Sequence, residues 1–117
     1  MRLLGYEFLE RDMTGLVADM RAAMSGARMT VVVPLNAACL VYAERDPAKR
    51  AIVARGDWHV LDSRVVAGLA KLLGVATPPV VPGSDLTVEL LARGLTSADR
   101  VCLVVAALIT IISVMNG

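Results

Sequence analysis

The stretch VVVPLNAACLVYAERDP, Val31 to Pro47, decides the fold. Together with the two residues before it, its β-branched start predicts a strand over Met29–Leu35 that is buried on both faces, as in a parallel sheet. Pro34 has no N–H to donate to the ladder, so strand pairing should fail near the end of this run. An Asn that ends a buried run costs free energy unless its amide finds partners, so Asn36 indicates either a turn or a site.

Helical patterns lie on both sides of this strand. An apolar stripe predicts a helix over 14–25 with Thr14 as its N-cap, and the methionines on that stripe are more typical of core packing than of a partner-facing edge. After the strand, a helix is predicted over 37–45. Asp46-Pro47 then starts another helix, because Asp caps helix N-termini and Pro fits the first helical position.

A second strand, Trp58–Leu61, is followed directly by Asp62-Ser63 and by an amphipathic helix that Gly74 ends. In α/β proteins this junction places side chains at the carboxyl end of the sheet, where ligands bind. Asp62 is therefore a candidate for either the helix cap or a catalytic group. His59 alternates onto the opposite face of the strand, which favours a core histidine over a catalytic one.

The proline-rich stretch VATPPVVP, Val75 to Pro82, predicts a loop, and Gly83-Ser84-Asp85 opens a helix that runs to about Arg93. The free backbone N–H groups at this helix start suit an anion, although Asp85 would oppose a phosphate placed very close. The order of helices and strands predicts a single α/β domain over residues 1–117. Its sheet should be mostly parallel and Rossmann-like, with flanking helices.

Composition narrows the function classes. The 117 residues are 56% hydrophobic and 20% charged, which suits one domain with a real core. A net charge of +1 and 3% aromatic residues provide neither the basic face nor the stacking platform of a nucleic-acid-binding protein. Cys39 and Cys102 lie far apart without metal-ligand spacing, which is typical of reduced core thiols in a cytoplasmic protein. No GxGxxG follows the first strand, which disfavours a dinucleotide-binding domain.

The last segment, Val101 to Gly117, carries no charged residue. Its apolar part is close to the lower length limit of a membrane-spanning helix, and its Ile, Val and Thr content fits buried strands equally well. We favour a strand over 101–105 and treat 105–117 as an atypical apolar tail. Because this tail lacks a Gly-rich turn and a polar helix face, we expect the chain to be truncated before the α/β pattern is complete.

The combination of these motifs resembles the amino-terminal half of the WecG/TagA/CpsF glycosyltransferase family. The shared features are a strand that ends in Asn, an Arg-Asp-Pro helix start, an Asp after the next strand, a Leu-Leu-Gly helix end and a Gly-Ser-Asp helix start. The resemblance covers about residues 4–104. The combination in this order is far more specific than any one motif.

This resemblance implies a bacterial enzyme of exopolysaccharide or cell-wall polymer biosynthesis. Such enzymes move a sugar, often of the N-acetylmannosamine type, from a UDP-sugar to a saccharide on a polyprenyl diphosphate carrier, with inversion. They work at the inner face of the cell membrane, which implies a cytoplasmic and peripheral location for this chain. Self-association into a homo-oligomer is left open.

The family's proposed base falls on Asp62 and its sugar-contacting asparagine on Asn36, while Gly83, Ser84 and Asp85 match its Gly-Ser/Thr-Asp motif. Inverting transfer needs a carboxylate that takes the proton of the acceptor hydroxyl while that oxygen attacks the anomeric carbon opposite the diphosphate. Asp62 suits this role. Asn36, with both donors and acceptors, suits the orientation of a sugar hydroxyl or amide.

The diphosphate leaving group needs positive charge or N–H dipoles. The chain has no Asp-x-Asp pair, so we expect no metal and no other cofactor, with helix N-termini or arginines in their place. Arg45, Arg50 and Arg55 are candidates, although a solvated helix face is their more typical role.

Three positions depart from the family pattern. Pro34 stands where the family has Thr, Ser63 where it has Gly, and Val80-Val81-Pro82 where it has an Arg. Each departure removes a hydrogen-bond donor or backbone freedom near the expected site. The alternative hypothesis is a truncated, non-catalytic remnant or interaction module whose apolar tail binds a membrane or another chain.

Overall fold

The computed structural model describes residues 1–105 and 110–115. A parallel pair of strands forms its centre: β3 (Val32–Leu35) lies beside β4 (Trp58–Leu61), with Leu35 opposite Leu61. Single parallel bridges add Phe8 and Val80 to β4, at His59 and Leu61 respectively. Since Leu61 already pairs with β3, the strand β4 lies in the middle of this small parallel arrangement.

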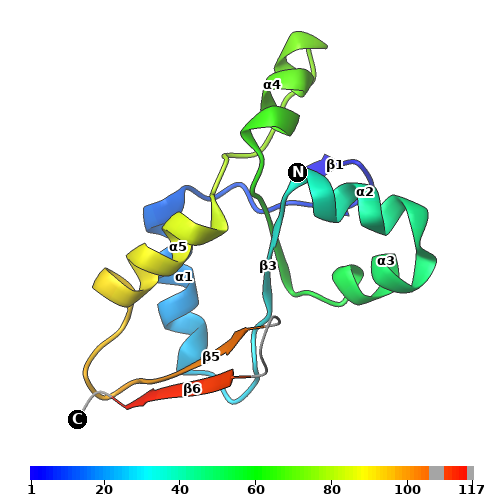
Figure 1. The fold of residues 1–117 in the computed structure, drawn as a ribbon. Coiled ribbons are helices and arrows are strands. Elements are labelled where there is room, and N and C mark those ends of the chain that lie inside the picture. The colour runs from blue at the N-terminus through cyan, green and yellow to red at the C-terminus, as the bar shows by residue number, and fades with distance from the viewer. Residues whose placement is uncertain (106–109, 116–117) are drawn as a thin grey trace.

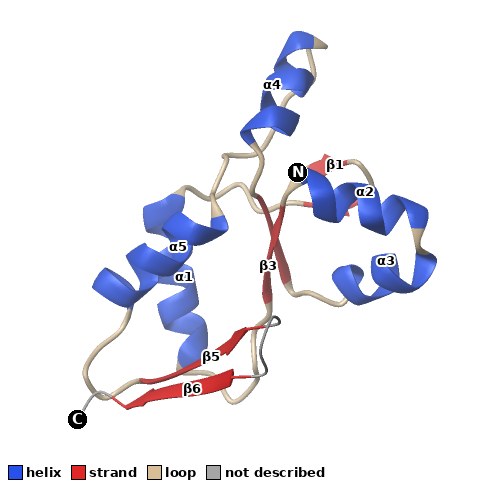
Figure 2. Ribbon diagram, viewed as in Figure 1, coloured by secondary structure: helices blue, strands red, loops and turns tan. Residues whose placement is uncertain are grey.

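Helices cover both faces of the parallel pair (Figure 1). α1 (Met13–Met24) and α5 (Gly83–Glu89) lie together on one side, and α2 (Ala37–Arg45) and α3 (Pro47–Ala54) lie together on the other. Figure 2 shows the two strands between these helix pairs. The arrangement is a small three-layer α/β/α unit.

The core is divided between the two faces of β4, as the period-2 alternation of a strand requires. Leu61 is completely buried in one cluster with Ala43 of α2, whereas Val60 is buried in a second cluster with Leu16 of α1 and Leu86 of α5. Both faces of β4 therefore carry buried apolar side chains, as in a parallel strand that helices cover on both sides.

The helix starts follow capping chemistry. Asp46 caps α3 and Pro47 takes its first position, as predicted. The prediction that Thr14 caps the first helix is wrong, because α1 begins at Met13 and Asp12 is its cap, accepting the Gly15 N–H at 2.8 Å. Asp is a stronger N-cap than Thr, so the helix begins at Met13, one residue earlier than predicted.

The remaining elements lie around this unit. α4 (Arg64–Leu72) projects away from the rest of the chain in Figure 1, and α5 continues into the π-helical turn η1 (Leu90–Gly94). β5 (Arg100–Val105) pairs with β6 (Thr110–Met115) in an antiparallel hairpin.

A second, shorter hairpin precedes α1 and was not predicted. β1 (Arg2–Leu3) pairs with β2 (Tyr6–Glu7) across a turn in which Leu4 and Gly5 have φ of 53° and 83°. Two successive positive φ values are typical of a type I′ hairpin turn, and glycine adopts them readily. Gly5 is the residue that could have indicated the turn, but strands of two residues are too short to show an alternation of apolar and polar residues.

The α/β class is confirmed. The strands do not form the single, mostly parallel sheet that was predicted. In the described residues there are three two-stranded ladders, and only that of β3 and β4 is parallel. The strand predicted over 101–105 is present, but it pairs with β6 instead of extending the parallel pair. Of the predicted tail 105–117, residues 106–109 and 116–117 lie outside the described residues.

Two further expectations concern a membrane-spanning helix and the thiols. No helix within the described ranges is both long and apolar enough to cross a membrane. Cys39 and Cys102 are both free, but only Cys39 packs partly against the core. Cys102 is exposed on β5, so its assignment to the core was wrong, because β5 lies in a separate hairpin.

Candidate functional site

The carboxyl ends of β3 and β4 bring two predicted site residues to the same edge. Asn36 and Asp62 each follow one member of the Leu35–Leu61 pair. The Asp62 N–H donates to the Leu35 carbonyl at 2.9 Å, which fixes the backbone at this point. Ligands of α/β proteins bind outside the carboxyl ends of parallel strands, so this edge is the candidate site.

Asp62 is not the cap of the helix that follows it. Ser63 is the N-cap of α4: its buried Oγ accepts the Val66 N–H at 3.0 Å. Within the described part of the chain, the Asp62 carboxylate has no hydrogen bond and no ion pair. The capping role that the sequence allowed for Asp62 is therefore taken by its neighbour, and the carboxylate is left for another partner.

The loop before α5 brings Gly83 against Asp62. The Val81 N–H donates to the Leu61 carbonyl at 2.8 Å, which draws this loop to the carboxyl end of β4. A Cβ at position 83 would lie 3.2 Å from Asp62 Oδ2 and 3.3 Å from the ring of Pro34. Asp62, Gly83 and Pro34 therefore converge, and the absence of a side chain at position 83 leaves the carboxylate its place.

The other two residues of the Gly-Ser-Asp motif are less closely placed. Ser84 and Asp85 are exposed in the first turn of α5, and no contact in the described residues joins them to Asp62. Pro82 occupies the N-cap position without a side-chain cap hydrogen bond. Of the three motif residues, the structure brings only Gly83 to the carboxylate.

The side chain of Asn36 caps the helix that follows β3. The residue is the exposed N-cap of α2, with Oδ1 accepting the Cys39 N–H at 2.8 Å, so a local capping role accounts for an Asn at this position. The capping bond occupies only the oxygen of the amide, and the Nδ2 group has two N–H donors of its own. The residue is thus fixed in place by its backbone role at the same strand edge as Asp62.

The arginines suggested for a diphosphate do not gather at this edge. Arg50 contacts Glu44 at 3.3 Å and stacks over the Tyr6 ring, with 5.0 Å between its guanidinium carbon and the ring centre. Arg55 follows α3 and leads into the amino end of β4, opposite to the Asp62 end. Arg45 is exposed at the last position of α2. A structural or solvated role fits all three.

His59 is the core histidine that the strand alternation predicted. It is 9% exposed, its Nε2 lies 2.7 Å from the Val53 carbonyl of α3, and its ring packs beside that of Tyr6. Asp62 faces the α5 side through its contact with Gly83. The two residues therefore lie on opposite faces of β4, and His59 is not part of the site.

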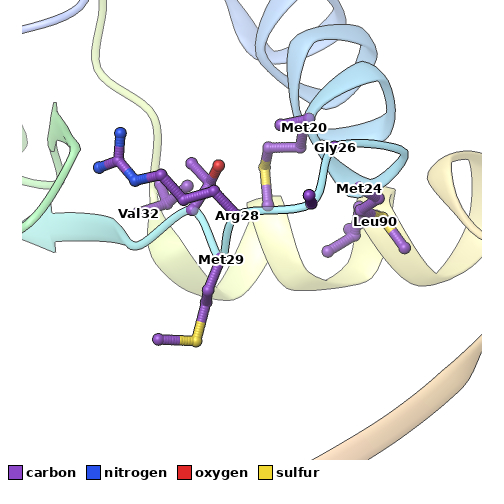
Figure 3. Close-up of a pocket in the computed structure, with 10 residues that line it drawn as sticks. Met20, Met24, Gly26, Arg28, Met29, Val32 and Leu90 are labelled. Carbon is purple, nitrogen blue, oxygen red and sulfur yellow. The ribbon is translucent and has the colours of Figure 1, made fainter.

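A separate hollow lies at the other end of β3 (Figure 3). Its volume is about 470 Å³, and Met20, Met24 and Met29 line it together with Leu90 of η1. Met20 also packs against the core, as predicted, but Met24 is about half exposed. The hollow reaches β3 at Val32, its amino end, so it is distinct from the edge that carries Asp62.

Sequence reasoning missed two contributors to the site. Pro34 was noted only for its effect on strand pairing and as a departure from the family pattern, yet its ring lies 3.3 Å from where a Cβ at position 83 would be. Ser63 was noted only as a second departure from the family pattern, yet it caps α4. The signal for Ser63 was present, since Ser directly before the first helical residue is a preferred N-cap. In the described residues, no group of three His, Cys, Asp or Glu side chains is placed to hold a metal ion.

In this α/β unit, Asn36 and the Asp62 carboxylate, which caps no helix, follow the two parallel strands at the edge where α/β proteins bind ligands. The description of the family whose model matches the chain, over residues 1–109, is "Glycosyl transferase WecG/TagA/CpsF family". The chain belongs to this family of glycosyltransferases, which act in polysaccharide synthesis. No curated protein and no solved structure matches it.

Proposed function

We propose that the chain takes part in inverting transfer of a hexose derivative, of the N-acetylmannosamine type, from a UDP-sugar to a saccharide on polyprenyl diphosphate. The product belongs to a bacterial exopolysaccharide or cell-wall polymer. Family membership supports the reaction class. The observation that supports the role of Asp62 is the position of its carboxylate. It caps no helix, and it lies against Gly83 at the carboxyl end of β4.

In this proposal Asp62 is the general base. It accepts the proton of the acceptor hydroxyl as that oxygen bonds to the anomeric carbon, while the bond from that carbon to the UDP oxygen breaks and UDP leaves from the opposite face. General-base catalysis of this kind contributes on the order of 10²–10⁴ in rate. A carboxylate that already capped a helix would be a poorer base, because the capping N–H stabilises its charged form.

Asn36 and the Gly83-Ser84-Asp85 turn are proposed to hold the donor. The Asn36 amide offers N–H donors to a sugar hydroxyl or acetamido oxygen, and the turn admits the substrate because Gly83 has no side chain. The reaction is proposed to need no metal or other cofactor, with N–H dipoles stabilising the departing diphosphate. The chain is proposed to be cytoplasmic and to act peripherally at the inner face of the membrane.

A thermal-shift titration tests the donor site. UDP and UDP-N-acetylhexosamines bind the folded state alone, so they must raise the melting temperature as their concentration rises. We expect a rise for the wild type and for Asp62→Asn, because the base is not needed for donor binding. CDP is the matched control for the base of the nucleotide. A folded sample that shows no shift with millimolar UDP or UDP-sugar would contradict the proposal.

A further inference from the structure

Helix α4 exposes its apolar residues instead of burying them. The exposed fractions are 67% for Val65, 56% for Leu69 and 82% for Leu72, and Leu73 just after the helix is 76% exposed. Figure 1 shows why: α4 projects from the three-layer unit, so only its inner side meets the rest of the chain. An exposed contiguous apolar patch of this kind indicates an interaction surface.

The exposed residues form one stripe. Val65, Leu69 and Leu72 follow the i, i+4, i+7 spacing that places side chains on one helix face. The inner side is made by Val66 and Ala67, which pack partly against the core, and by the buried Ala70. α4 is thus apolar on two sides, and only one of them has a partner within the described residues.

The charges beside the stripe are all positive. Arg64 and Lys71, seven residues apart, lie on the same face of the helix about two turns from each other, and both are exposed. No acidic residue occurs from Ser63 to Ser84, although the whole chain has 11 acidic against 12 basic residues. An apolar stripe beside a cationic edge is the pattern of a helix that lies in a membrane interface.

We propose that α4 docks onto a bilayer surface with anionic headgroups, with the stripe Val65, Leu69 and Leu72 entering the interface and the edge Arg64 and Lys71 on the headgroups. A second copy of the chain fits this surface less well, because an antiparallel two-fold contact through the stripe would place the cations of both copies along the same side, and no acidic side chain of α4 would offset them. Anionic headgroups complement the edge, and acyl chains cover the stripe.

This proposal deepens the peripheral location in the proposed function, on which it rests for its biological setting. It does not depend on sugar transfer. Vesicle binding and UDP-dependent stabilisation are separate readouts, so the failure of either can be recognised without the other.

Co-sedimentation with vesicles tests the surface. The wild-type chain is expected to bind vesicles of equal parts phosphatidylglycerol and phosphatidylcholine, and to bind pure phosphatidylcholine at least about tenfold less. Leu69→Ser/Leu72→Ser should lower binding to the anionic vesicles by on the order of tenfold or more. Ile52→Ser/Val88→Ser is the matched control, because these side chains are similarly exposed, at 66% and 63%, on α3 and α5.

A charge variant keeps the test decisive if the serine variant does not fold. Arg64→Gln/Lys71→Gln alters only exposed side chains, and it should lower anionic-vesicle binding by on the order of tenfold while circular dichroism stays unchanged. Three results would overturn the proposal. These are wild type that does not bind, binding that neither α4 variant reduces, and a dimer in light scattering that the α4 serine variant dissociates.

Discussion

The junction of β4 and α4 shows how two adjacent residues divide two tasks. Asp and Ser are both good N-caps, so the sequence alone left Asp62 between capping and catalysis. The extended backbone of Ser63 puts its hydroxyl over the first turn of α4, and the Val66 N–H is satisfied there. The Asp62 carboxylate lies against Gly83 instead, with Oδ2 3.2 Å from where a Cβ at that position would be. Ser63 therefore caps the helix, and the Asp62 carboxylate takes no part in capping.

Asn36 should separate its structural role from its proposed binding role. Asn36→Asp keeps an oxygen for the Cys39 N–H, so the free energy of unfolding should change little, whereas UDP-sugar binding should weaken because the amide N–H donors are gone. Asn36→Ala should lose about 1 kcal/mol of stability as well. Urea unfolding and the thermal-shift titration measure the two effects. Unchanged donor binding in Asn36→Asp would exclude the amide from the site.

Gly83 is expected to matter for the site more than for the fold. In Gly83→Ala the new Cβ would lie 3.2 Å from Asp62 Oδ2, so the carboxylate or the Pro34 ring must shift by a few tenths of an ångström. We expect a folded protein with a smaller UDP-sugar-induced shift in melting temperature.

Gly68→Ala is the matched control for this change. A Cβ there meets nothing within 4 Å, and alanine is the better helix former by about 0.5–1 kcal/mol. Gly68→Ala should therefore be more stable and keep the full response to the donor. Equal responses of the two alanine variants would show that Gly83 does not shape the donor site.

At the scale of elements, the sequence predicted the helices and central strands well. The helix over 37–45 and the strand Trp58–Leu61 have the predicted bounds, because caps and apolar runs mark their ends locally. The strand predicted over Met29–Leu35 is shorter than expected and begins at Val32. Met29 lies in the preceding loop, where it lines the hollow at the amino end of β3. Pairing continues through Pro34, which lies opposite Val60, so the predicted failure of pairing there was wrong.

Asp99 attaches the segment after η1 to α1, and the stability that this contact provides should depend on pH. Asp99 accepts the Thr96 N–H at 2.6 Å, and it also pairs with Arg21 of α1. The Thr96 N–H first, and then Arg21, hold the pKa of this carboxyl below its ordinary value. A lowered folded-state pKa stabilises the fold above the unfolded-state pKa, and this stabilisation is lost as the pH falls through the folded-state pKa.

Asp99→Asn should therefore be less stable than the wild type at neutral pH, and the two should converge at acid pH. Melting temperatures measured across a pH series give the difference directly. Asp19→Asn is a control, because it removes the ion pair between Arg11 and Asp19 of α1 and leaves the attachment through Asp99 intact. A difference between Asp99→Asn and the wild type that stayed constant down to acid pH would contradict the assignment.

At the scale of the whole molecule, the α/β class and the family followed from local motifs in order, but the sheet did not. The pairing of β5 could not be predicted, because its apolar residues fit a parallel neighbour or a hairpin partner equally well. The site edge was predictable because Asn36 and Asp62 follow consecutive parallel strands. The contact of Pro34 with Gly83 was not, since it depends on where a proline-rich loop lies in space.

The proposed role of Asp62 as the base of a glycosyl transfer is tested most directly by product formation from a UDP-N-acetylhexosamine and a polyprenyl-diphosphate-linked saccharide. The wild type should form product, and Asp62→Asn should bind the donor yet lose on the order of 10²–10⁴ in rate. Ser63→Thr, which keeps a capping hydroxyl, should stay within a few-fold of the wild type. Product formation by Asp62→Asn at the wild-type rate, or donor binding by the wild type without any product, would contradict this account.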